Sequence, residues 1–146
     1  MEQIISKNQI ETEKIGQDLA QKYLYSGGII FLTGDLGAGK TAFVRGFAKG
    51  LGITRTISSP TFVFLKIYDR LYHLDLYRLE NPSQFEMLGI REIIESDPKK
   101  IFIIEWPDKA NLSNIFAKKI TFLKTKSDNE RIITIFRKRC TIKPTF

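Results

Sequence analysis

The sequence predicts an α/β fold organised around one glycine-rich turn that lies between a strand and a helix. A short apolar run, Gly28 to Thr33, precedes the turn and is typical of a buried strand. An amphipathic segment, Thr41 to Leu51, follows the turn and presents its apolar side chains on one helical face. Farther along, Lys100 to Glu105 has the continuous apolar centre of a strand in a parallel sheet that is covered on both faces.

The turn between the first strand and its helix, Gly34 to Thr41, fits the pattern of a phosphate-binding loop. Its glycines allow successive backbone N–H groups to point at one anion. Lys40 adds a charge that can reach the β- and γ-phosphates, and the Thr41 hydroxyl is suited to Mg²⁺. A glycine-rich turn can match by accident, but the strand before it and the helix after it favour phosphate binding. The predicted loop residues are Gly34, Asp35, Leu36, Gly37, Ala38, Gly39, Lys40, Thr41 and Ala42.

Length and composition predict one globular domain over residues 1–146. The chain is 42% hydrophobic and has 11 Phe, which is enough apolar material for a core. Its N-terminus lacks the pattern of a signal peptide, and no apolar stretch has the length of a membrane span. One cysteine, Cys140, cannot close an internal disulfide. We therefore expect a cytoplasmic protein with no membrane partner.

The net charge of +7 is concentrated at the C-terminal end. Residues 1–97 carry 11 Lys/Arg and 12 Asp/Glu, a net charge of −1, whereas residues 98–146 carry 12 and 4, a net charge of +8. A basic C-terminal hairpin and tail, 117–146, could present an electrostatic face to RNA or to an acidic protein surface. It could equally be a solvated face that serves solubility.

The first helix is expected at Thr12 to Tyr25, with Thr12 as its N-cap. After the loop helix comes a polar turn, Ser58 to Phe62. In phosphate-loop hydrolases the segment after that helix often senses the γ-phosphate, which makes Thr61 a switch candidate. The alternative is a Ser-Pro turn that only begins the next strand.

Phe62 to Tyr68 and Leu71 to Tyr77 predict an antiparallel hairpin. In its second strand, alternation places His73 and Asp75 on one face. A neutral His73 satisfied by a neighbour is the favoured interpretation of that histidine. An inward carboxylate needs a partner, and for Asp75 we expect Mg²⁺ or a positioned water.

The second half of the chain begins with short helices at Pro82 to Leu88 and Ile90 to Ser96. The strand after them delivers the Glu105 carboxylate to the sheet edge where Mg²⁺ is expected. Pro107 is expected to hold Trp106 extended, either at the rim of the site or as a buried anchor. Lys118 to Lys124 and Arg131 to Lys138 predict a closing hairpin.

The motifs GDLGAGKT, SPTF, YHLDLYRL, LGIREII and IEWP follow one another in this order. Together they resemble the TsaE family, also called YjeE, of small bacterial ATPases that work in making the threonylcarbamoyladenosine of tRNA. The resemblance spans about residues 10 to 138 and is much more specific than the phosphate loop alone. It implies a P-loop NTPase-like three-layer sandwich with a mixed parallel and antiparallel central sheet.

The resemblance also implies Mg²⁺-dependent ATP hydrolysis and partnership with the TsaD and TsaB proteins, through whose complex tRNA is reached. It implies that Lys40 holds phosphates, that Thr41 and Glu105 position Mg²⁺, and that Asp75 orders the metal or the attacking water. Further implied site residues are Thr61 in the switch, Trp106 at the active or partner face, and Thr12 and Arg131 near the nucleotide base.

Two departures from the family pattern are Ala42, where threonine is usually repeated, and Ile115-Phe116, where Leu-Pro is common. Neither bears on a catalytic role. Two other functions remain open on the residues: a small-molecule kinase that uses the same loop, and a nucleotide-gated binding module. No long basic insertion suitable for a kinase lid is evident.

Overall fold

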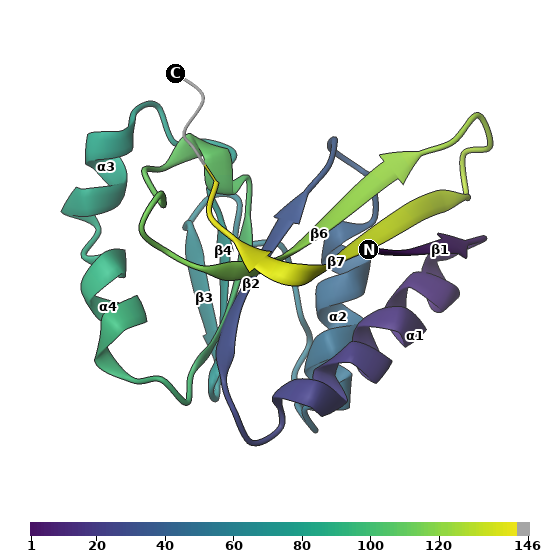
Figure 1. Ribbon diagram of the computed structural model, residues 1–146, viewed down its shortest axis with the longest axis horizontal. Helices are drawn as coiled ribbons and strands as arrows, with labels where there is room; N and C mark the ends of the chain where they lie inside the picture. The colour runs from purple at the N-terminus through teal and green to yellow at the C-terminus, as the bar shows by residue number, and fades with distance from the viewer. Residues whose placement is uncertain (143–146) are drawn as a thin grey trace.

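The computed structural model describes residues 1–142 and has a seven-stranded mixed sheet between two helical layers (Figure 1). The strand order is β1-β7-β6-β2-β5-β4-β3. β5 pairs in parallel with β2 and β4, and β2 also pairs in parallel with β6; the remaining pairs are antiparallel. The predicted α/β class, three layers and mixed sheet are confirmed. The elements are β1 (Glu2–Ser6), α1 (Gln9–Ala20), η1 (Gln21–Tyr23), β2 (Gly28–Thr33), α2 (Lys40–Gly50), β3 (Leu65–Tyr68), β4 (Leu71–Asp75), α3 (Pro82–Met87), α4 (Ile90–Ser96), β5 (Ile101–Glu105), η2 (Pro107–Lys109), β6 (Ala117–Lys124) and β7 (Arg131–Cys140).

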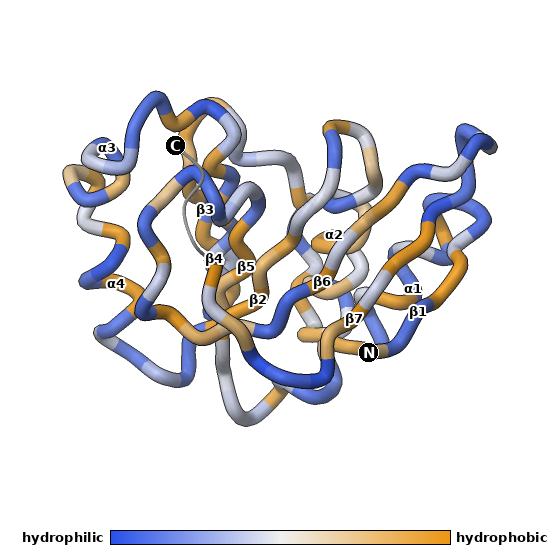
Figure 2. The backbone as a smooth tube through the Cα atoms, turned by 45° about the horizontal axis from the view of Figure 1, so that its top comes forward, coloured by the Kyte–Doolittle hydropathy of each residue, from blue (hydrophilic) through white to orange (hydrophobic). Residues whose placement is uncertain are grey.

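Two hydrophobic clusters lie on opposite faces of the sheet. Figure 2 shows that the strands at the centre of the molecule are largely apolar. Successive residues of β2 contribute to different clusters: Ile30 and Leu32 pack beneath α1 and α2, whereas Phe31 packs on the side of α3 and α4. This alternation follows from the two-residue period of a strand. It explains why β2 and β5 consist almost entirely of apolar residues, since both of their faces are covered.

Helices α1 and α2 approach each other backbone to backbone. A Cβ atom placed on Gly16 would lie 2.2 Å from the Phe43 carbonyl oxygen, and one on Gly46 would lie 1.8 Å from the Glu13 carbonyl oxygen. Only glycine permits this approach. The close crossing fixes the start of α1 relative to the start of α2, where the predicted phosphate-binding loop ends.

Several predicted boundaries at the N-terminal end are wrong. Helix α1 begins at Gln9, with the Asn8 side chain as its N-cap at 2.9 Å from the Glu11 N–H, so Thr12 lies inside the helix and is buried. The edge strand β1 was not predicted. It pairs antiparallel with β7, from Glu2 opposite Ile135 to Ser6 opposite Arg131.

Two other elements differ in length from the prediction. The first strand of the hairpin begins at Leu65, because Phe62 and Val63 lie in an exposed turn. Strand β7 continues to Cys140, and the final part of the predicted basic tail, residues 143–146, lies outside the described residues. The remaining strands and helices agree with the prediction to within a few residues.

Candidate functional site

A cavity of about 340 Å³ lies at the carboxyl ends of β2, β4 and β5. In an α/β sheet this edge is the usual position of a ligand site. The predicted site residues that line the cavity are Thr12, Leu36, Gly37, Gly39, Lys40, Thr41, Ala42, Thr61, Asp75, Glu105 and Arg131. The topology thus brings together residues from the whole length of the predicted domain.

The cavity is also lined by five residues that are not among the predicted site residues: Asn8, Gln9, Arg45, Ser59 and Asn129. Ser59 belongs to the polar turn that was recognised, and Asn8 has the sequence signature of an N-cap. Arg45 and Asn129 have no comparable local signal, because their positions depend on helix packing and on the β6–β7 turn.

The loop before α2 holds the Lys40 side chain against its own backbone. Lys40 Nζ donates to the carbonyl oxygens of Gly34 at 2.5 Å and Asp35 at 2.8 Å. It also lies 5.0 Å from the centre of the Trp106 ring, within cation–π range. Gly34, Asp35 and Trp106 are therefore connected to the site through Lys40. Gly39 is the N-cap residue immediately before α2, and its φ of 101° lies in the left-handed region.

Burial lowers the pKa of Lys40 from its usual 10.5, while the nearby carboxylates of Glu105, Asp75 and Asp35 act in the opposite direction. Desolvation disfavours the charged ammonium form. A polyanion bound beside Lys40 would favour that charged form. The environment of the lysine is therefore suited to a ligand that brings negative charge into the cavity.

Asp75 is held by three protein donors. Its Oδ2 accepts from the Thr61 hydroxyl at 2.8 Å and from the Ser59 hydroxyl at 3.4 Å, and its Oδ1 accepts from the Tyr77 N–H at 3.0 Å. Protein groups therefore already supply hydrogen-bond partners to this carboxylate, and its contact with Mg²⁺ or a positioned water stays a prediction. The arrangement connects the predicted switch turn directly to the carboxylate at the end of β4.

Glu105 lies directly beside Asp75 in the register of β4 and β5. Its Oε1 is 2.8 Å from His73 Nε2, and both side chains are buried. This contact is short enough for a hydrogen bond between the imidazole nitrogen and the carboxylate oxygen. The prediction that a neighbour satisfies His73 is confirmed for this nitrogen. Within residues 1–142, Nδ1 has no hydrogen-bond partner.

Trp106 is not extended, contrary to the prediction. Its φ of 54° and ψ of 51° place it in the left-handed region at the start of η2. Pro107 disfavours the right-handed helical region for the preceding residue, and the prediction overlooked the left-handed alternative. The sharp turn places the indole 5.1 Å from the Tyr77 ring, beside Lys40.

Thr12 and Arg131 both lie against the loop. The Thr12 hydroxyl is 2.7 Å from the Ser6 hydroxyl, and its methyl carbon would lie 3.6 Å from a Cβ on Gly39. Arg131 donates to the carbonyl oxygens of Ala38 and Gly37, each at 3.1 Å. Ala38 therefore takes part in this contact through its backbone carbonyl, whereas its side chain is buried.

The oxygen donors of the cavity fit a magnesium ion that is bound together with phosphates. Thr41, Asp75 and Glu105 supply a hydroxyl and two carboxylates to the lining of one cavity. In residues 1–142 no group of three or more His, Cys, Asp or Glu side chains could hold a metal ion. Mg²⁺ suits such a site because it is commonly bound by one or two carboxylates, by waters and by phosphates of the substrate.

The order and spacing of these residues match a known protein family. The family model described as "Threonylcarbamoyl adenosine biosynthesis protein TsaE" matches residues 6–133. The chain belongs to the TsaE family. This assignment confirms the resemblance inferred from the motifs, and it places the chain in a family of tRNA threonylcarbamoyladenosine biosynthesis.

Individual TsaE relatives agree with the family match. The chain is 39% identical over 131 residues to the tRNA threonylcarbamoyladenosine biosynthesis protein TsaE of Bacillus subtilis, covering 87% of this chain and 80% of that protein. It is 47% identical over 104 residues to the protein of the same name from Synechocystis, covering 67% of this chain and 65% of that relative, slightly less than two thirds of its length. The crystal structure of YdiB from Bacillus subtilis superposes with a TM-score of 0.70 at 32% identity, covering 92% of this chain and 83% of YdiB.

No helix within residues 1–142 has the length and apolar character that crossing a membrane requires.

Proposed function

We propose that this protein is a Mg²⁺-dependent ATPase that acts with the TsaD and TsaB proteins in forming threonylcarbamoyladenosine beside the anticodon of tRNA. The observation that supports this proposal best is the convergence of Lys40, Thr41, Asp75 and Glu105 on one cavity at the end of the parallel strands. A phosphate loop with two adjacent acids is suited to a nucleoside triphosphate and its metal.

In this proposal the loop N–H groups and Lys40 bind the phosphates. Thr41 and Glu105 would hold Mg²⁺, whose charge would offset the charge that develops on the phosphate oxygens. His73 orients Glu105 through its hydrogen bond to Oε1. Asp75 is fixed by donors from the switch turn and β4, and in this position it would orient the attacking water.

The Thr61–Asp75 contact supports a role for the Ser58 to Phe62 turn as a phosphate sensor. The Thr61 hydroxyl donates to Asp75 at 2.8 Å while also lining the cavity. A γ-phosphate or its metal would compete for the same hydroxyl. The turn would then take different positions with ATP and ADP, as switch segments do in other phosphate-loop hydrolases.

Dependence on partner proteins is supported by the contacts of the arginines near the site. Arg78 follows β4, but its guanidinium lies 4.3 Å from the centre of the exposed Phe62 ring. Of the arginines that line the cavity, Arg45 is 3.5 Å from Glu13, and Arg131 donates to loop carbonyl oxygens. In phosphate-loop hydrolases an arginine that contacts the transferred phosphoryl group raises turnover by a factor of about 10³–10⁵. We therefore expect slow hydrolysis by the chain alone and stimulation when TsaB and TsaD are added.

The test is ATP hydrolysis with Mg²⁺ by the purified chain, alone and with TsaB and TsaD. Lys40→Ala and Glu105→Gln are expected to lower turnover about a hundredfold or more, because each removes electrostatic stabilisation at the phosphates. Lys49→Ala is the matched control, since Lys49 lies in the last turn of the same helix. Its turnover should stay within about twofold of the original chain, as expected for a surface substitution.

Hydrolysis that rises with the partners and disappears in both site variants is the expected result. Full turnover without partners, unchanged when they are added, would contradict the proposed role. Phosphate transfer to a small molecule would instead indicate a kinase. A Glu105→Gln variant that binds ATP and supports normal tRNA modification would indicate a nucleotide-gated binding module.

A further inference from the structure

The guanidinium of Arg131 is hydrogen-bonded to two segments at once. Its Nε and Nη2 atoms donate to the Ala38 and Gly37 carbonyl oxygens, each at 3.1 Å. Its Nη1 atom donates to the carbonyl oxygens of Asp128 at 2.6 Å and Glu130 at 2.9 Å. Four of the five N–H groups of an arginine are thus assigned to backbone acceptors. The side chain joins the phosphate loop to the β6–β7 turn, residues 125–130.

From these contacts we propose that Arg131 is a positioning residue that holds the phosphate loop in its anion-binding conformation and couples it to the β6–β7 turn. This inference rests on the proposed function for its consequence in nucleotide binding. It differs from the expectation drawn from the family resemblance, in which Arg131 lies near the nucleotide base.

The geometry of the peptide group explains how Arg131 acts on an anion through carbonyl groups. In a trans peptide the C=O of one residue and the N–H of the next point in opposite directions. Anchoring the Gly37 and Ala38 carbonyls therefore directs the N–H groups of Ala38 and Gly39 away from Arg131. The Ala38 N–H closes the loop at 3.1 Å from the Asp35 carbonyl oxygen. Gly39 lies at the start of α2, where backbone N–H groups have no acceptor within the helix.

The backbone of Arg131 is itself well fixed. It begins β7, where Ser6 of β1 lies opposite on one side and Lys124 of β6 on the other. Ser6 in turn contacts the Thr12 hydroxyl at 2.7 Å. The guanidinium therefore extends from a three-stranded support to the loop, and it does not depend on a flexible surface segment for its position.

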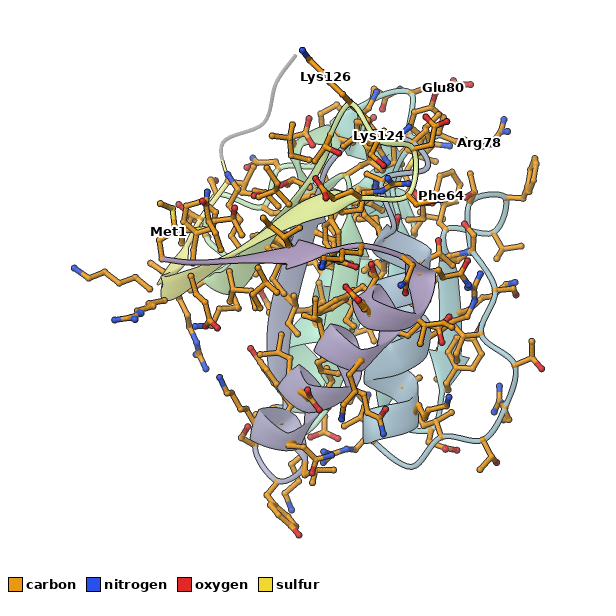
Figure 3. All side chains as sticks on the ribbon, turned by 90° about the vertical axis from the view of Figure 1, so that its right-hand side faces the viewer. Met1, Phe64, Arg78, Glu80, Lys124 and Lys126 are labelled. Carbon is orange, nitrogen blue, oxygen red and sulfur yellow. The ribbon has the colours of Figure 1, made fainter. Side chains whose placement is uncertain are left out.

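The neighbouring Lys124 offers a contrast in the same place. A Cβ on Gly37 would lie 3.4 Å from Lys124 Nζ, so this ammonium is also beside the loop. Figure 3 shows Lys124 and Lys126 near the β6–β7 turn, at the same end of the molecule as Arg78 and Glu80. A lysine is a point charge, whereas the planar fork of arginine can bridge several carbonyl groups. Lys124 is thus a control for charge without the bridging geometry.

The test compares the complete chain with Arg131→Lys, Arg131→Met and Lys124→Met. In the ligand-free proteins, amide hydrogen exchange at residues 35–40 is followed by NMR, with β2 and β5 as internal references. Both Arg131 variants should raise the amide exchange rate in the loop about tenfold or more, while the two strands keep their protection. The reason is that opening the loop costs less free energy when there are no Arg131 hydrogen bonds to break. Lys124→Met should leave loop exchange within about threefold.

Affinity is then measured by calorimetry with ATP and with inorganic tripolyphosphate, both with Mg²⁺. Arg131→Lys should lower the affinity for both ligands about tenfold or more. It keeps the positive charge, but it removes the bridging hydrogen bonds. The loop would contact the phosphates, which both ligands have. The ratio of the affinity for ATP to the affinity for tripolyphosphate should therefore stay unchanged. Lys124→Met should produce a smaller loss that disappears at high salt, as expected for an exposed charge.

Three results would overturn the positioning role. The first is unchanged loop exchange in both Arg131 variants. The second is full affinity in Arg131→Lys, which would identify Arg131 as a simple cation. The third is weakened ATP binding with normal tripolyphosphate binding, which would place Arg131 at the base. If Arg131→Met does not fold, the lysine variant decides. Raised loop exchange in a chain that binds neither ligand would support the positioning role and contradict the proposed ATPase.

Discussion

The two helical layers that cover the sheet differ in how they are built. Helices α1 and α2 have 12 and 11 residues and meet backbone to backbone at Gly16 and Gly46. Helices α3 and α4 have 6 and 7 residues, and they pack through side chains such as Phe85 and Ile90. The first layer is long and closely fitted, whereas the second is short and interrupted at Gly89 (Figure 1).

The two layers also differ in their contribution to the cavity. Helix α2 begins at the phosphate loop, and the start of α1 brings Thr12 to the same cavity. Within residues 1–142, none of the cavity-lining side chains comes from α3 or α4. We infer that the α1–α2 layer sets the geometry of the site, while the α3–α4 layer contributes mainly burial of the opposite face. Substitutions in matched pairs can test that division.

The largest effect is expected from Gly46 in the α1–α2 layer, and Gly89 in the other layer is its comparison. Gly46→Ala places a Cβ 1.8 Å from the Glu13 carbonyl oxygen, so the two helices must separate. We expect a loss of about 4 kcal/mol or more in the free energy of unfolding, in the range of severe core disruption. Gly89→Ala should cost only about 1 kcal/mol, because Gly89 has a positive φ of 67° but an open surrounding. Urea denaturation measures both; equal losses would contradict the difference in packing.

A smaller effect is expected from Phe47→Leu and Phe85→Leu, one buried aromatic residue in each layer. Each should lower the free energy of unfolding by about 1–2 kcal/mol through lost packing. Only Phe47→Leu should also weaken tripolyphosphate binding, because Phe47 lies on α2 and contacts the Phe43 ring 6.2 Å away. Calorimetry on the folded variants measures this. Equal affinities in the two variants would show that the site does not depend on the α1–α2 layer.

The smallest effect concerns an exposed ion pair. Arg91 Nη2 lies 2.8 Å from Glu86 Oε1, and this hydrogen bond lowers the pKa of Glu86. The pair therefore stabilises the fold above the unfolded pKa of a glutamate, and that stability is lost as the pH falls through the lower folded value. Arg91→Ala should cost at most about 1 kcal/mol at neutral pH and less in acid.

The control for this ion pair lies in the other layer. Arg45 is 3.5 Å from Glu13 and also lines the cavity. Arg45→Ala should have an equally small effect on unfolding but should weaken tripolyphosphate binding, whereas Arg91→Ala should leave that binding unchanged. Thermal unfolding across pH and calorimetry at neutral pH measure the two effects. Weaker binding in Arg91→Ala would contradict the separation of the layers.

Local patterns were sufficient for much of the fold. The strand Gly28–Thr33 and the helix Ile90–Ser96 were predicted with the observed bounds, because continuous apolar runs and glycine breaks are encoded within a few residues. The expectation that Glu105 ends a buried strand is also confirmed, since β5 runs from Ile101 to Glu105. These features depend on short-range periodicity.

Some of the differences from the prediction have long-range causes, and others are local. Strand β1 has few apolar residues, and its order comes from pairing with β7, more than a hundred residues away. The Arg131 contacts join residues 93 and 94 positions apart. Trp106 takes a left-handed conformation because η2 turns sharply there. The N-cap of α1 is a local signal, since Asn8 is as good a cap as Thr12, and the prediction chooses Thr12.

Trp106 has a practical consequence for spectroscopy. It is the single tryptophan of the chain, and its ring lies 5.0 Å from Lys40 Nζ. Excitation of the indole therefore reports on one location, beside the lysine that would exchange its Gly34 and Asp35 carbonyl contacts for phosphate oxygens. The chain thus contains an intrinsic fluorophore at its candidate site, and ligand arrival there can be followed in real time without a label.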